Sequence, residues 1–132
     1  MPEERLQDLR ITIADDAAGS GALLERVTLQ LRRAIQELPV EEVNPVREQA
    51  DGLEGTKAFD YAVAGALAVK LLPEVVPLLC DLLKRWLHSS NSRRLTLLCG
   101  ETEIEVAGDI TPQQTAAIVL ALAAKRNHGH KR

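Results

Sequence analysis

The spacing of apolar and polar positions changes along the chain, and each change predicts a new element. Residues 9–13 alternate one by one, a period of two that predicts a strand with one buried face. Between Ser20, a suitable helix cap, and Pro39, which stops a helix, apolar positions recur every three or four residues. This period predicts a helix whose buried face consists of Leu24, Val27, Leu31, Ile35 and Leu38.

The next segment, "VEEVNPV" from Val40 to Val46, has an extended character. Because Pro45 has no N–H for a strand ladder, we expect at best an edge strand there, with Val43 and Val46 as candidate contact positions. The polar stretch "REQADGLEG" that comes next contains two glycines and predicts a surface loop.

A long, mostly apolar stretch over residues 62–86, "AVAGALAVKLLPEVVPLLCDLLKRW", decides the rest of the prediction. Its polar positions are spaced by three and four residues, as on one face of a helix; they are Lys70, Glu74, Pro77, Asp81, Lys84 with Arg85, and His88. We therefore expect one long helix over residues 56–87 with a kink or break near Leu72, where Pro73 either bends the helix or opens its second half as a first-turn residue. A charged stripe in mid-span argues against insertion into a bilayer.

The first half of this expected helix consists of small residues with almost no polar face. Such a surface must be covered either by the same domain or by another chain, and the sequence leaves both alternatives open. We take as candidate interaction residues Ala62, Gly65, Ala66 and Val69 from this half, together with Trp86 at the helix end and the two valines of the edge segment.

The C-terminal part contains two alternating segments, 95–99 and 102–107, separated by Gly100 and Glu101. They predict a hairpin with a type II′ turn. Thr111 and Gln114, with Pro112 between them, predict a capping box and a last helix that ends near Arg126. The expected protein is a single α+β domain over 1–126 with the order β-α-β-α-β-β-α, a small sheet packed against helices, and a flexible basic tail at 127–132.

Composition narrows the classes of partner. The net charge is -3, and the only aromatic residues are Phe59, Tyr61 and Trp86, which disfavours nucleic-acid binding. The first ten residues alternate acids and bases where a signal peptide would need an apolar run, so we expect a cytoplasmic protein and no membrane partner.

Few residues suggest chemistry. The histidines fall at a helix end and in the tail, and Cys80 and Cys99 are expected to be buried thiols. A metal site at Asp15 or Asp16 is a rival hypothesis, although neighbouring residues of a strand point in opposite directions. We expect no catalytic, metal-binding or cofactor-binding residue, and a protein that is not an enzyme.

From residue 55 onward the order of motifs is "GTKAFDY", "LLKRWL", "SRR", "LTLLCGETEIEVAG" and "TPQQTAAIV". This order resembles the effector-associated constant component domain, a bacterial family of predicted NTP-dependent conflict, or defence, systems. Trp86, Gly55 and Lys57 are the best individual matches, whereas Ala58 stands where the family would have glycine.

The resemblance implies a non-enzymatic module that connects an effector, such as a caspase-like or trypsin-like protease, to its regulators. The expected partner is therefore a protease-like or NTPase-like effector or regulatory protein encoded nearby, with a homo-oligomer also possible. The alternative hypothesis is a membrane-active module that exposes the 62–86 helix when triggered.

Overall fold

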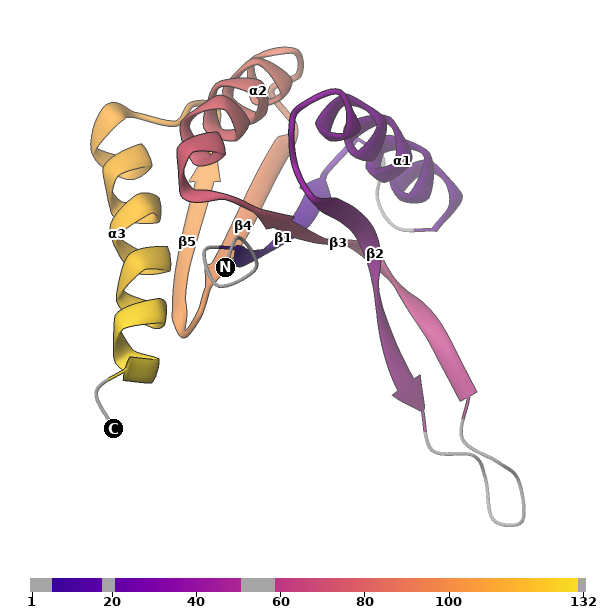
Figure 1. Cartoon of the computed structure of the whole chain (residues 1–132). Helices are drawn as coiled ribbons and strands as arrows, with labels where there is room; N and C mark the ends of the chain where they lie inside the picture. The colour runs from indigo at the N-terminus through magenta and orange to yellow at the C-terminus, as the bar shows by residue number, and fades with distance from the viewer. Residues whose placement is uncertain (1–5, 18–20, 51–58, 131–132) are drawn as a thin grey trace.

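A computed structural model describes residues 6–17, 21–50 and 59–130 of the chain. These residues form a five-stranded antiparallel sheet and three α-helices, so the α+β expectation is confirmed (Figure 1). The elements follow in the order β1 (Gln7–Asp15), α1 (Ala22–Gln36), β2 (Glu42–Ala50), β3 (Phe59–Leu71), a 3₁₀ turn (Pro73–Val75), α2 (Val76–His88), β4 (Arg93–Cys99), β5 (Thr102–Ala107) and α3 (Pro112–His130).

The strands lie in the order β2-β3-β1-β4-β5, so the first strand in sequence is at the centre of the sheet. The unit β1-α1-β2-β3-α2-β4, with β1 between β3 and β4, is the ferredoxin-like split βαβ arrangement. In this chain β5 extends the sheet beyond β4, and α3 comes after it.

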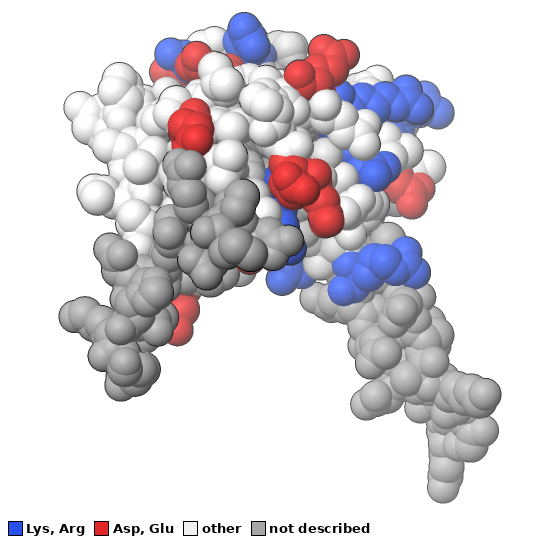
Figure 2. All heavy atoms as spheres, viewed as in Figure 1, with Lys and Arg blue, Asp and Glu red and all other residues white. Residues whose placement is uncertain are grey.

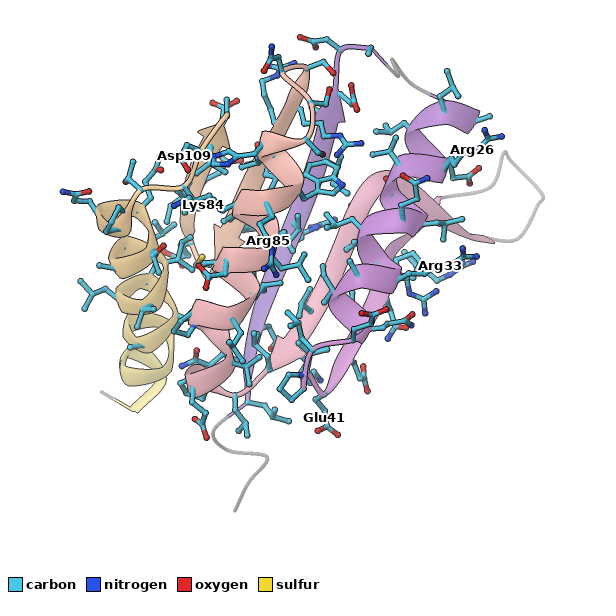
Figure 3. The ribbon with its side chains drawn as sticks, turned by 90° about the horizontal axis from the view of Figure 1, so that it is seen from above. Arg26, Arg33, Glu41, Lys84, Arg85 and Asp109 are labelled. Atoms are coloured by element: carbon cyan, nitrogen blue, oxygen red, sulfur yellow. The ribbon has the colours of Figure 1, made fainter. Side chains whose placement is uncertain are left out.

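All three helices lie over one face of the sheet (Figure 3). The apolar core fills the space between the layers and takes alternate residues of each central strand, including Leu9, Ile11, Ile13, Leu67, Val69, Leu71, Leu95 and Leu97. The period-two prediction for the first strand is therefore confirmed. We call the opposite side of the sheet the open face.

Helix α1 follows its predicted pattern, because Leu24, Leu31 and Ile35 are buried and Val27 packs against the core. The residue at the N-cap position is Gly21, at φ 86° and without a side-chain hydrogen bond. Ser20, the predicted cap, lies outside the described residues.

The predicted long kinked helix is wrong. Residues 59–71 form strand β3, and helix α2 begins only at Val76. The physical reason is a size alternation between large residues that enter the core, such as Leu67, and alanines such as Ala68 on the open face. Pro73 starts the 3₁₀ turn and does not kink a helix.

The predicted polar stripe is accordingly divided among β3, the 3₁₀ turn, which contains Glu74, and α2. Lys70 belongs to β3, whereas Pro77, Asp81, Arg85 and His88 are exposed along α2 as expected. Residues on both sides of a strand-to-helix junction cannot form one helix face. Only the part of the stripe from Pro77 onward therefore lies along the exposed face of an amphipathic helix.

Strand β2 is an edge strand that contains Pro45, as predicted. It runs further than expected, because residues 47–50 of the predicted loop pair with β3. Residues 51–55 of that loop, and Lys57, lie outside the described residues.

The C-terminal hairpin turns at Gly100, whose φ is 67°, while no described non-glycine residue has a positive φ. A positive φ at the first central position alone fits the type II′ turn. The capping box is present, since the Gln114 N–H donates to Thr111 Oγ1 at 3.1 Å and the Thr111 N–H donates to Gln114 Oε1 at 2.9 Å. Helix α3 passes the expected end at Arg126 and includes residues 127–130 of the predicted tail.

Candidate functional site

A buried polar cluster joins the end of β1 to the start of β4. The Asp15 side chain is only 6% exposed; its Oδ1 accepts hydrogen bonds from Ser92 Oγ at 2.6 Å and the Ala17 N–H at 3.0 Å. Its Oδ2 lies 3.4 Å from Arg93 Nε. The cluster satisfies a buried carboxylate and fixes the relative position of two central strands.

Arg93 extends this cluster to the end of α2. Its guanidinium donates to the Trp86 carbonyl at 3.1 Å and to Ser89 Oγ, and it lies 4.4 Å from the centroid of the Trp86 ring. A cation at a helix C-terminus and over an aromatic face is favourable in both positions. Arg93 therefore ties β1, β4 and α2 together.

These contacts leave little support for the rival metal hypothesis. Asp15 is bound by Arg93, and the carboxylate of Asp16 accepts from Arg94 at 2.8 Å, so each acid has an arginine as its ionic partner. Among the side chains that the structure describes, no three histidine, cysteine or acidic groups come together where they could hold a metal ion.

Both cysteines are buried in the core, as predicted. Burial raises the pKa of the Cys80 thiol, which also has a hydrogen bond with Thr115 of α3. Burial, together with the neighbouring Cys80, raises the pKa of Cys99 to about 11. At neutral pH both groups are therefore protonated and weakly nucleophilic.

A second charged cluster lies on the surface of the helical layer, where Lys84 and Asp109 approach each other (Figure 3). Asp109 Oδ1 lies 3.9 Å from Lys84 Nζ and 3.1 Å from His88 Nε2, and it accepts the Ile110 N–H at 2.8 Å. Although desolvation acts to raise it, the pKa of Asp109 is lowered by these hydrogen bonds and charges. The cluster fastens α2 to the connection before α3.

Four of the predicted interaction residues lie inside the protein. Val43 and Val69 belong to the core, and Ala66 is 2% exposed. Gly65 lies beneath α1, where an added Cβ would meet the Ile13 carbonyl oxygen at 2.8 Å. In the folded chain these residues are covered by the protein itself. Gly65, Ala66 and Val69 were chosen from the first half of a predicted helix that the structure replaces with β3, and Val43 was chosen from the edge segment.

The other three occupy different places. Ala62 pairs with Arg47 where β2 and β3 extend beyond the rest of the sheet. Trp86 is partly buried under Arg93, and its Nε1 is a buried donor without a described partner. Val46 is half-exposed on the open face. The structure therefore does not bring these residues together.

The open face is the surface that the sequence prediction missed. One row of cross-strand neighbours crosses all five strands, in the order Asn44, Ala68, Arg10, Leu98 and Glu103. A shallow hollow of about 250 Å³ lies along this row, lined by Asp8, Leu9, Arg10, Val46, Ala68, Leu98 and Gly100. The signal in the sequence was alanine at every second position from Ala62 to Ala68, where a strand usually carries larger residues.

Two further surfaces lie on the helical layer. A groove of about 480 Å³ separates α1 from α2 and is lined by Ala34, Glu37, Leu38, Leu82, Arg85 and Trp86. Residues 112–124 of α3 include no charged residue, and the described surface over the N-terminal part of this helix shows no charged side chain in Figure 2. Leu120 on α3 is 69% exposed.

No described helix has both the length and the apolar character needed to cross a membrane. The alternative hypothesis of a membrane-active 62–86 helix loses its premise, because residues 62–71 belong to β3.

Comparison with known proteins assigns no family to the chain: no family model matches it, and neither does any curated protein or solved structure. The fold and its surfaces are therefore the basis on which a function can be assigned.

Proposed function

We propose that this protein is a non-enzymatic interaction module that binds another protein through the open face of its sheet. The observation that carries the proposal is the make-up of this face. Small and apolar side chains at Ala68, Leu98 and Val46 lie around Arg10 in the middle of the face, and its margin on β5 carries the exposed acids Glu103 and Glu105. Arginine is among the residues enriched in protein–protein interfaces, where a polar margin surrounds the buried centre.

The chemistry of the face indicates the partner that would fit it. A side chain that fills the hollow beside Ala68 would be apolar, and basic groups next to it would face Glu103 and Glu105. The resemblance to the effector-associated family supplies the setting, a cytoplasmic bacterial defence system. We propose that the partner is the protease-like or NTPase-like effector or regulator encoded beside it.

Association, not catalysis, is supported by the state of the reactive groups. The two thiols have raised pKa values, and the acids of the β1 end are held by arginines. The three helices cover one side of the sheet, and the open face is its other side (Figure 3). A partner can therefore bind to the open face without displacing a helix.

The test has two steps. Co-expression with each neighbouring gene product identifies the partner, and calorimetric titration of the two separately purified proteins measures the dissociation constant. Ala68→Arg places a long side chain in the hollow and is expected to weaken binding at least about tenfold. Leu78→Arg is the matched control, because Leu78 is 48% exposed on α2, in the opposite layer. Equal binding by the two variants, or no binding by any neighbour, would contradict the proposal.

A further inference from the structure

Strands β2 and β3 continue beyond the five-stranded sheet as a two-stranded ribbon (Figure 1). The pairing of β1 with β3 ends at Thr12 and Ala66, whereas β2 and β3 pair again from Arg47 with Ala62 to Ala50 with Phe59. We call residues 47–50 and 59–62 the arm.

The arm begins at an irregularity in the ladder. The register shifts between Pro45, which pairs with Leu67, and Arg47, which pairs with Ala62. Four residues of β3, 63–66, therefore lie opposite the single residue Val46. An insertion of this kind bends a strand and redirects the residues beyond it, and it includes Gly65 at φ 78°.

In the described ladders, β3 of the arm pairs on one side only, with β2. Its other edge presents backbone N–H and C=O groups that can pair with another strand. A two-stranded ribbon is marginally stable by itself, so a further strand would stabilise it.

The three strand edges of the sheet differ in how they discourage pairing. The outer edge of β2 carries Pro45 and charged residues on both sides of it, and β5 carries Glu103 and Glu105. Prolines and charges are the usual means by which proteins protect such edges. The β3 segment 59–64, "FDYAVA", has a single charge and no proline. Among the described strands it is the edge whose sequence carries the least protection.

We propose that this edge pairs with the same edge of a second copy of the chain. A two-fold axis aligns a strand antiparallel to itself, which gives the order β2-β3-β3-β2 across two copies. With the axis at Ala62, Ala62 of each copy lies opposite Ala62 of the other and Asp60 lies opposite Ala64, so like charges do not meet. Because this edge has one charge, it offers few contacts that would favour the strand of a different protein. A second copy of the chain carries the same edge, which is what a two-fold pairing requires.

The inference goes beyond the proposed function and is independent of it. Pairing through the arm leaves both open faces accessible, so the dimer would present two partner-binding surfaces. A contact confined to six residues of one edge is smaller than a standard interface of about 800 Å² per partner. The dimer is therefore expected to dissociate on dilution.

Sedimentation velocity over a range of concentrations tests the pairing on the whole chain. The unmodified protein is expected to shift from monomer to dimer. Ala62→Lys places two lysines close to the axis and is expected to raise the dimer dissociation constant about fivefold or more. Ala107→Lys is the matched control, since it adds the same charge to the exposed end of β5.

A mixing experiment separates loss of pairing from loss of folding. Ala62→Lys and Ala62→Glu copies are each expected to be more monomeric than the unmodified chain and to form a mixed dimer when combined. In addition, Ala62→Cys is expected to form a disulfide-linked dimer and Ala107→Cys is not; the native thiols are buried.

The inference is overturned by a protein that stays monomeric at every soluble concentration, or by a dimer that the Ala62 variants leave unchanged. It fails separately from the proposed function: Ala68→Arg on the open face is expected to leave the dimer intact, and Ala62→Lys is expected to leave each copy able to bind the partner.

Discussion

Replacement of Gly65 by alanine is expected to destabilise the fold markedly. Gly65 has φ 78°, and a Cβ built on it lies 2.8 Å from the Ile13 carbonyl oxygen and 3.3 Å from Leu24 Cδ2. A non-glycine residue at positive φ costs about 1–2 kcal/mol. Forcing an atom against β1 backbone costs about 1–3 kcal/mol more, as overpacking does elsewhere. The expected loss in the free energy of unfolding is therefore about 2–5 kcal/mol, a large part of the total for a small domain.

Gly108→Ala provides the matched control, because Gly108 has φ 80° but nothing within 4 Å of its added Cβ. It should lose only the conformational part, about 1–2 kcal/mol. Urea unfolding of both variants, followed by far-ultraviolet circular dichroism, measures the difference. If Gly65→Ala loses no more than Gly108→Ala, the close approach of β3 to β1 beneath α1 is not as described.

Three other perturbations test the remaining parts of the fold. Thr111→Ala removes the hydroxyl that accepts the Gln114 N–H at 3.1 Å and should cost about 1 kcal/mol in urea unfolding, whereas Thr111→Ser should retain the cap. Arg93→Met removes the guanidinium beside the carboxylate of Asp15, which is 6% exposed, and should cost about 2–4 kcal/mol; much of the loss should return in the double variant with Asp15→Asn, and strictly additive losses would argue against the pair. Burial and the neighbouring thiol raise the pKa of Cys99 from 9.0 to about 11, so the unfolded chain ionises first and stability should fall as the pH rises from 9 to 11. Cys99→Ala should lack that part of the decline, and an identical decline in both proteins would refute the assignment.

The elements that could be predicted from the sequence are those in which apolar and polar residues are clearly distinguished. Residues 9–13 alternate large apolar with polar side chains, and α1 has polar residues opposite its buried face. The capping box was also predictable, because its hydrogen bonds join residues three apart in the chain. Local chemistry of this kind needs no knowledge of the tertiary fold.

Strand β3 could not be recognised in the same way, because alanine is apolar in composition but small enough to lie on an open sheet face. A division into apolar and polar residues places alanine in the same class as leucine and valine. The alternation of Ala66 and Ala68 with the larger Leu67 and Val69 is therefore lost, and the period of two cannot be seen. Alanine also has the highest helix propensity of the amino acids, and its frequency in this segment favoured the incorrect prediction of a helix. The size alternation, Gly65 and the β-branched valines were the signals available.

The open face and the arm edge were out of reach for a different reason. Both depend on long-range register: the row through Ala68, Arg10 and Leu98 exists only once β3, β1 and β4 lie side by side. Of the candidate residues chosen along one segment, Gly65, Ala66 and Val69 are buried in the folded chain, and the exposed surface formed by several strands went unnoticed.

The central position of β1 also determines the order in which the chain can fold. Both of its neighbours come much later in sequence: Ile11 pairs with Leu67 and with Leu97. During synthesis β1 must therefore wait without a ladder partner until β3, and then β4, emerge. Contacts of such long range slow folding to the millisecond-to-second range typical of topologies rich in non-local pairing. The β4–β5 hairpin, by contrast, needs only its own two-residue turn and can form early.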